Sequence, residues 1–214
     1  MKEDILKYVE SHSDREPDYL YRHERLTNIR LINGRMCSGH LQGRVLKMLV
    51  GMIDPQRALE LGTFTGYSAL CIAEGLSDHG HLDTVEADDE LKDFIDEAFE
   101  NSPYARKITL HISDALTFIK RADNEYYDFI FIDADKRQYP EYYEECMRVL
   151  KPGGYILADN TLWDGHVIEP LKAKDRHTEA IMRFNDIVAA DTSVEKVILP
   201  IRDGLTIIRK LKAK

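Results

Sequence analysis

The sequence has 214 residues, of which 43% are apolar and 31% are charged, and its formal net charge is −9. It has no run of about 18 apolar residues, which argues against a membrane-spanning helix. The acidic balance disfavours a nucleic-acid partner, although it is compatible with a local basic patch. The charged N-terminus lacks a secretion signal, and Cys37, Cys71 and Cys146 are too scattered for a disulfide framework or a zinc site. We therefore expect one cytoplasmic domain with no membrane partner.

Residues 1–54 are predicted to form an N-terminal helical segment, because the apolar residues of 39–53 recur at the spacing of one helix face. Beyond Pro55, strand-like and helix-like stretches alternate. The predicted strands are 57–61, 81–87, 107–113, 127–133 and 155–159. The predicted helices are 67–76, 89–102, 115–122, 139–150 and 177–191. Residues 194–201 and 204–212 are expected to close the fold as an antiparallel pair.

Alternation of this kind predicts an α/β fold, with a mostly parallel sheet formed by 55–214 and helices on both of its faces. In such sheets ligands bind outside the carboxyl ends of the strands. Several predicted strands end in polar residues, which we therefore expect along one edge: Glu60, Glu86, Asp114, Asp133, Asp159 and Asn160.

The stretch "ELGTFTGYS" at 60–68 is a glycine-containing turn between a strand and a helix. The dinucleotide-binding fingerprint needs a glycine where Phe64 stands, which argues against an NAD-dependent dehydrogenase. Glu60 would repel phosphate and attract a cation, so a cationic nucleoside such as S-adenosylmethionine fits better. Glu86, at the end of the next strand, could accept hydrogen bonds from ribose hydroxyls. The alternative is a plain tight turn with solvated acids.

A second site is predicted where the strands at 127–133 and 155–159 end. Because sequential strands are usually neighbours, Asp133, Asp159 and Asn160 should converge. Two carboxylates and an amide oxygen form a hard ligand set, suited to Mg²⁺ and also to Mn²⁺ or Ca²⁺. The alternative is that Asp133 caps a loop and that the Asp159–Asn160 pair makes a turn.

Several stretches in order, "ALELGTFTGYSAL", "FIDADKRQY", "ADNTLWDGHV" and "PIRDGLTIIRK", resemble the cation-dependent, S-adenosylmethionine-dependent O-methyltransferases. The closest resemblance is to the caffeoyl-CoA/catechol group, and it covers about residues 15–210. It implies a Rossmann-like class I methyltransferase fold with a seven-stranded sheet, and a homodimer. Thr206 and Asp135 depart from the catechol enzymes, which carry a glutamate and a tryptophan at these places.

The resemblance also assigns roles to individual residues. The implied cofactor contacts are Met36, Ser38, Glu60, Gly62, Thr63, Ser68, Glu86, Asp114, Ala115, Asp133 and Asp135. The implied metal ligands are Asp133, Asp159 and Asn160, and the implied substrate contacts are Lys136, Trp163 and Asp164. Lys136 matches the proposed general base, and we count Asp133 with it as catalytic.

The expected reaction is metal-dependent methyl transfer from S-adenosylmethionine to a hydroxyl of a small vicinal-dihydroxy aromatic. A phenol has a pKa near 10, and a bound dication lowers that pKa. The same dication would disfavour the charged form of Lys136, which could then accept the hydroxyl proton. A surface salt bridge with Asp135 or Glu141 is the alternative for this lysine. Methylation of a tRNA hydroxyuridine, known for some relatives, is the alternative reaction.

Overall fold

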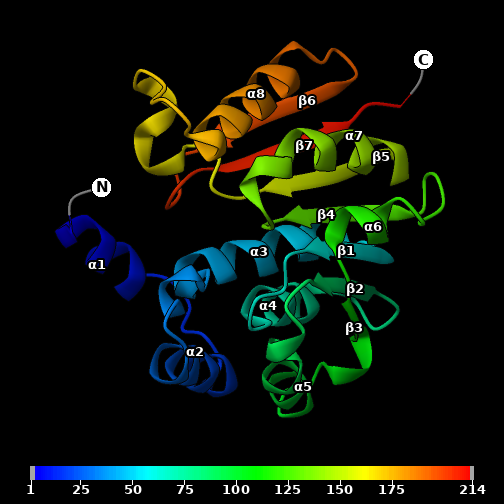
Figure 1. The fold of residues 1–214 in the computed structure, drawn as a ribbon. Helices are drawn as coiled ribbons and strands as arrows, with labels where there is room; N and C mark the ends of the chain where they lie inside the picture. The colour runs from blue at the N-terminus through cyan, green and yellow to red at the C-terminus, as the bar shows by residue number, and fades with distance from the viewer. Residues whose placement is uncertain (1–2, 213–214) are drawn as a thin grey trace.

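The computed structural model describes residues 3–212, and its centre is a twisted sheet with the strand order β3-β2-β1-β4-β5-β7-β6 (Figure 1). All neighbouring strands are parallel except those that pair with β7. The strands are β1 (Arg57–Leu61), β2 (His81–Glu86), β3 (Ile108–Ile112), β4 (Tyr127–Ile132), β5 (Leu150–Ala158), β6 (Val194–Leu199) and β7 (Leu205–Lys210). The prediction of a mostly parallel seven-stranded α/β sheet with an antiparallel C-terminal pair is confirmed.

Helices surround this sheet, and short 3-10 turns join several of the elements. The α-helices are α1 (Glu3–Ser11), α2 (Asp18–Arg30), α3 (Gly39–Ile53), α4 (Tyr67–Gly75), α5 (Lys92–Glu100), α6 (Ala115–Ile119), α7 (Tyr139–Val149) and α8 (Arg176–Ala190). The 3-10 turns are η1 (Gly34–Met36), η2 (Asp89–Leu91), η3 (Ala105–Lys107), η4 (Lys136–Gln138) and η5 (Trp163–Ile168). None of the helices within 3–212 is long and apolar enough to cross a membrane.

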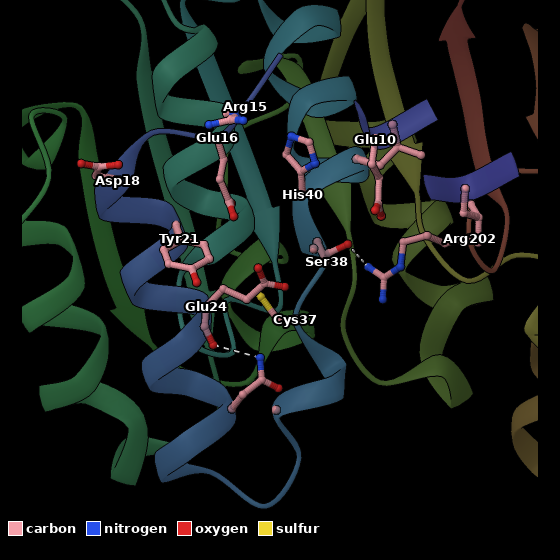
Figure 2. A pocket seen from close by; sticks show the side chains of 15 residues that line it. Glu10, Arg15, Glu16, Asp18, Tyr21, Glu24, Cys37, Ser38, His40 and Arg202 are labelled. Carbon is pink, nitrogen blue, oxygen red and sulfur yellow. Dashed lines mark hydrogen bonds between the residues drawn. The ribbon is translucent and has the colours of Figure 1, made fainter. Parts of the chain in front are cut away.

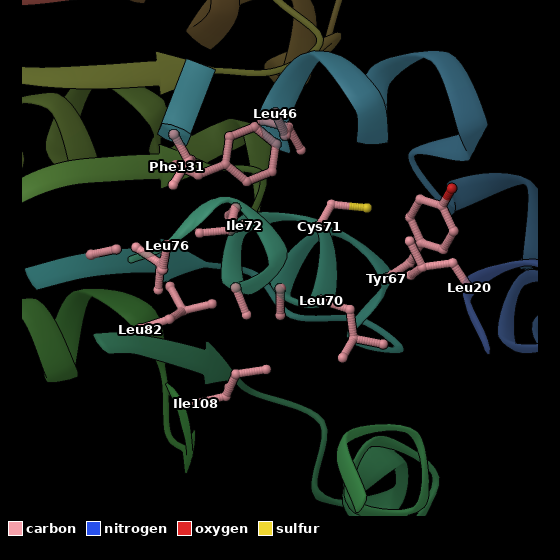
Figure 3. Close-up of a cluster of buried hydrophobic side chains, with 14 of the residues drawn as sticks. Leu20, Leu46, Tyr67, Leu70, Cys71, Ile72, Leu76, Leu82, Ile108 and Phe131 are labelled. Carbon is pink, nitrogen blue, oxygen red and sulfur yellow. The ribbon is translucent and has the colours of Figure 1, made fainter. Parts of the chain in front are cut away.

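Two apolar clusters hold the helices against the sheet, one on each face, because successive strand side chains point to opposite faces. Ala58 faces the cluster with α3, α4 and α5, which is drawn in Figure 3. Its neighbour Leu59 faces the cluster with α6, α7 and α8. Each fully buried leucine, isoleucine or phenylalanine contributes roughly 1.5–3 kcal/mol to folding. The three cysteines are free and buried in these clusters.

The element boundaries differ from the prediction mainly at β5. Residue 155 was expected to begin this strand, but it begins at Leu150, directly after α7. Leu150 pairs with Tyr127 of β4, and the register then shifts so that Tyr155 pairs with Phe129. The "KPGG" stretch therefore does end the helix, as predicted, but it lies within the strand as an irregular segment.

Candidate functional site

The carboxyl ends of β2, β1, β4 and β5 form one continuous edge. Backbone hydrogen bonds extend past the strands: Thr63 N donates to Val85 O, and Asp133 N donates to Leu61 O, at 3.1 and 2.9 Å. Gly62 makes the close approach possible, since its φ is +95° and a Cβ there would lie 2.3 Å from the carbonyl oxygen of Asp133. This edge is where the sequence predicted the binding residues.

Glu60 is fully buried at this edge and lies in a small polar network. Its Oε2 accepts a 2.5 Å hydrogen bond from the Thr84 hydroxyl, which shares a 2.6 Å hydrogen bond with Thr63. Burial raises the pKa of Glu60 to about 8, and the carboxylates of Asp133 and Glu86 act in the same direction. Its other oxygen, Oε1, is buried and makes no hydrogen bond of good geometry to the residues that the structure describes, although the nearby Ser68 hydroxyl opposes the rise of the Glu60 pKa. An orphaned buried carboxyl oxygen fits a site that receives a cationic ligand.

Glu86 ends β2 and faces the turn after β1. Its Oε2 accepts a 2.7 Å hydrogen bond from Phe64 N, and its Oε1 accepts from Ala87 N and Asp88 N, each at 2.9 Å. The carboxylate is thus fixed beside the glycine-containing turn. It already accepts these three hydrogen bonds, and an ionised carboxylate can accept about four, so one acceptor position remains for a ligand.

The remaining expected cofactor contacts lie around these two acids. Ser68, on α4, and Ser38, just before α3, are buried, as is Ala115 at the start of α6. Asp114 caps α6 by accepting a 2.8 Å hydrogen bond from Thr117 N, and the Met36 side chain is 55% exposed on η1. Within residues 3–212, no hydrogen bond joins Asp114 or the Met36 side chain to the other expected contacts.

Asp133 and Asp159 lie side by side, because Ile132 pairs with Ala158 and Asp159 N donates to Ile132 O at 3.0 Å. Burial raises the pKa of Asp133 to about 6, Lys136 opposes this shift, and the charge of Asp159 adds to it. Asn160 follows in the left-handed region, with a φ of 58°. Its amide nitrogen faces Asp203 at a long 3.5 Å, which leaves its oxygen as a potential ligand.

The predicted metal ligands are two carboxylates and one amide, which the fold brings to neighbouring strand ends. In the described part of the chain, no three His, Cys, Asp or Glu side chains come together as a metal site. The oxygen donors of Asp133, Asp159 and Asn160 nevertheless suit a hard divalent cation that keeps other positions open. The charge of Asp159 contributes to the raised pKa of Asp133, and a bound cation would relieve such a repulsion between neighbouring carboxylates.

Lys136, on η4, is largely buried and points back at the strand end. Its Nζ donates to Asp133 Oδ1 at 2.6 Å and to the Tyr139 hydroxyl at 3.0 Å. Burial would lower the pKa of Lys136, but the charges and hydrogen bonds of Asp133 and Tyr139 outweigh it and hold the pKa above its ordinary value. The alternative pairing with Asp135 or Glu141 is wrong, since Asp135 instead pairs with Arg137 at 2.6 Å.

The expected acceptor residues lie on the loop after β5. Trp163 is half-buried, packs against the core cluster of α6, α7 and α8, and stacks on His177 with ring centroids 6.1 Å apart. The Asp164 side chain is exposed. Non-glycine residues with positive φ gather at this edge: Phe64, Asn160, Trp163, Asp164 and Arg202.

A cavity of about 740 Å³ opens between the N-terminal helices and the turn that joins β6 to β7 (Figure 2). Arg202, from that turn, reaches across it and donates a hydrogen bond to the carbonyl oxygen of Ser38. Carboxylates outnumber guanidinium groups in the lining, whose charged members are Glu10, Arg15, Glu16, Asp18, Glu24 and Arg202.

Sequence reasoning missed three residues of this site. Gln42 Nε2 donates to Asp159 Oδ2 at 2.7 Å, and Gln42 Oε1 accepts from Arg202 Nη1 at 3.4 Å. Tyr139, the first residue of the predicted helix 139–150, is fully buried, and its hydroxyl donates to the carbonyl oxygen of Asp159 at 2.9 Å. The sequence offered one signal for Gln42, which is its polar side chain on the otherwise apolar face of the predicted helix 39–53.

The chain is similar to known methyltransferases over most of its length. A family model described as O-methyltransferase matches residues 10–211. Probable caffeoyl-CoA O-methyltransferase 2 of Dictyostelium discoideum is 31% identical over 211 residues, which are 97% of this chain and 91% of the relative. Caffeoyl-CoA O-methyltransferase 2 of Petunia hybrida is 34% identical over 180 residues, covering 79% of this chain and 74% of the relative.

Among solved structures, an SAH-bound methyltransferase of Podospora anserina has a similar fold. The TM-score is 0.87 with 28% sequence identity, and the match covers 99% of this chain and 97% of the other.

Proposed function

The chain belongs to the O-methyltransferase family, and from this premise we propose that it transfers the methyl group of S-adenosylmethionine to a hydroxyl of a small vicinal-dihydroxy aromatic acceptor, catechol or caffeoyl-like, with a divalent cation. The observation that carries the metal dependence is the adjacency of Asp133 and Asp159 at the ends of β4 and β5, with Lys136 beside them.

Support for the cofactor comes from two sides. The Podospora relative binds SAH, the product form of this cofactor. In the described part of the chain, Glu60 has a buried oxygen that makes no hydrogen bond of good geometry, and Glu86 is fixed beside the turn after β1. A cationic ligand next to Glu60 would favour its ionised form. Glu60 is proposed to face the methionine end and Glu86 the ribose.

The proposed metal ligands are Asp133, Asp159 and Asn160. When bound there, a divalent cation would polarise the acceptor hydroxyl and offset the charge of Asp133 that keeps Lys136 protonated. Lys136 is proposed to accept the hydroxyl proton at Nζ. Its short contact with Asp133 keeps that nitrogen at the ligand cluster. Trp163 is proposed to border the aromatic ring of the acceptor.

The acceptor class is supported by the metal ligands and Lys136, and the cavity adds nothing to it. The cavity adjoins the site at Ser38 and Arg202, but its lining includes neither the proposed metal ligands nor Lys136 or Trp163. The curated relatives are named for a CoA ester. Free catechols and a CoA ester are therefore both tested as acceptors.

The test is an acceptor screen with labelled S-adenosylmethionine, before and after removal of metal with a chelator. The arms are catechol, an amine-bearing catechol, caffeoyl-CoA and undermodified tRNA. We expect transfer to the free catechols, loss of transfer after chelation and recovery on adding Mg²⁺. Methylation of tRNA alone, or transfer that chelation leaves unchanged, would show that the proposal is wrong.

A further inference from the structure

Gln42 is a buried amide in the middle of the site, and neither the sequence motifs nor the family match assigns it a role. It lies on α3 and is 1% exposed. Its Nε2 donates a 2.7 Å hydrogen bond to Oδ2 of Asp159, across 117 positions of sequence. A glutamine on the core side of a helix has to satisfy its polar atoms, and here the partner is a proposed metal ligand.

Arg202 fixes which way this amide points. A guanidinium group has only donors, so it selects the oxygen of the Gln42 amide, and the contact between them is 3.4 Å. A carboxylate accepts only, so Asp159 selects the nitrogen. The order Arg202, Gln42, Asp159 therefore has one possible polarity, and a flipped amide would lose both contacts. Arg202 Nη1 also donates to the carbonyl oxygen of Ser38, which anchors the guanidinium.

The result is an aspartate that is oriented but not neutralised. Asp159 Oδ1 accepts from Asn160 N at 2.9 Å and Oδ2 accepts from Gln42. Both donors are uncharged, and none of the side chains that the structure describes forms an ion pair with Asp159. Each oxygen keeps a lone pair that a cation could use. A lysine or arginine in the place of Gln42 would bring a positive charge against this carboxylate.

The turn that carries Arg202 also holds the third proposed ligand. Its next residue, Asp203, accepts hydrogen bonds from Asp164 N and, at 3.5 Å, from the Asn160 amide. Leu162 N donates to the carbonyl oxygen of Asp203 at 2.8 Å. The β6–β7 turn thus contacts the residues after β5 on one side and, through Arg202, the start of α3 on the other.

We propose that Gln42 and Arg202 are positioning residues of the metal centre: Gln42 orients the Asp159 carboxylate, and Arg202 orients Gln42. The inference rests on the proposed metal-dependent function. Removing such a partner of a metal ligand typically costs about 10–100-fold in metal affinity or activity. Arg202 acts through one more residue and through a longer contact, so its removal should cost less than that of Gln42.

The test measures metal binding directly, by the electron paramagnetic resonance signal of free Mn²⁺ titrated into the full chain with S-adenosylhomocysteine. Gln42→Leu should weaken Mn²⁺ binding by roughly 10–100-fold, and raising Mg²⁺ should restore much of its transfer rate. Arg202→Ala should show a smaller loss, which Arg202→Lys partly recovers by keeping a donor. Calorimetry should show S-adenosylhomocysteine binding within about twofold of wild type for all three variants.

The matched control is Gln56→Leu, which removes an exposed glutamine just before β1, at the opposite edge of the sheet. If wild type binds Mn²⁺ and Gln42→Leu binds it equally well, the positioning role is wrong. If Gln42→Leu does not fold, Arg202→Ala on the exposed turn decides, and unchanged Mn²⁺ affinity there overturns the proposal. If wild type binds no Mn²⁺ and chelation leaves transfer intact, it is the proposed metal dependence that fails, and the positioning role falls with it.

Discussion

Lys136 and Asp133 form a partly buried ion pair of 2.6 Å. Asp133 directly follows β4 and Lys136 begins η4, so the short segment between them brings Nζ back onto the carboxylate. The same carboxylate is a proposed metal ligand, so one residue governs both the metal and the protonation of the lysine. Variants of Lys136 and Asp159 should separate these two roles.

Replacing Lys136 by alanine should leave metal binding intact while lowering the transfer rate by roughly 10²–10⁴, the usual contribution of a positioned base. The defect should shrink as the pH rises toward the phenol pKa near 10, because solution base then supplies the phenolate. A more acidic acceptor such as a nitrocatechol should rescue it in the same way. Rates are measured against pH with each acceptor.

The control for this variant is Lys151→Ala. Lys151 forms a comparable ion pair of 2.8 Å with Asp128, at the far edge of the same two strands. It should keep the wild-type rate. A Lys136→Ala enzyme that runs at the wild-type rate on every acceptor would remove the lysine from the mechanism.

Replacing Asp159 by alanine should abolish Mn²⁺ binding and methyl transfer together, because a ligand is lost and Gln42 loses its acceptor. Neither high pH nor a nitrocatechol should rescue this variant at ordinary metal concentrations. The two readouts are the Mn²⁺ titration and the transfer rate on the same preparation. Retained metal affinity would place the cation elsewhere.

Replacing Glu86 by alanine should weaken S-adenosylmethionine binding. Each lost charge-assisted hydrogen bond to the ribose is expected to cost roughly 1.5–3 kcal/mol at most. Calorimetric titration measures the affinity, and wild type should show no binding of NAD. Since Glu86 also accepts from Phe64 N, a melting curve is needed to check that the turn remains folded. Unchanged affinity would show that Glu86 does not bind the ribose.

Replacing Glu60 by glutamine should stabilise the ligand-free protein increasingly as the pH rises. The folded pKa of Glu60 is raised to about 8, whereas an unfolded glutamate has a pKa of about 4.3. Below about pH 4.3, Glu60 is protonated in both states and does not destabilise wild type. Above that pH, the free energy of unfolding falls by roughly 1.4 kcal/mol per pH unit, and it levels off above the folded pKa.

Calorimetric melting curves at several pH values check this. The difference in Tm between Glu60→Gln and wild type should grow from about pH 5 to about pH 8 and then stay constant. Groups that do not interact with Glu60 titrate alike in both proteins, so their effects cancel, whereas Asp133 and Glu86 are electrostatically linked to Glu60 and add a smaller difference. Parallel pH profiles would mean that Glu60 ionises normally in the folded chain.

The chain is predicted to form a homodimer through the apolar surface of its N-terminal helices. On α3, Met48 and Met52 lie one turn apart and are 64% and 78% exposed. Light scattering at micromolar concentration should give twice the chain mass of 24.7 kDa. The double variant Met48→Glu, Met52→Glu should shift this toward the monomer. A monomeric wild type would contradict the prediction.

The sequence predicted the edge of the sheet well because the relevant signals are local. Asp133 and Asp159 each end an apolar strand, and the rule that successive strands are neighbours brings them together. The supporting residues could not be found in this way. Gln42 and Arg202 meet across 160 positions, and Tyr139 reads as a packing residue until its hydroxyl is seen against Asp159. Such partners depend on how layers dock, which no local pattern encodes.

Phe64, Trp163 and Arg202 combine a long side chain with a φ of 48–49°, a conformation that costs an L-residue about 1–2 kcal/mol. Folded domains are stable by only about 5–15 kcal/mol, so the strain at these three residues destabilises the native state by a sizeable fraction of that amount. Heat resistance and methyl transfer should therefore oppose each other at this edge. Selection for thermostability alone would favour glycine at these positions and would erode the site that they build.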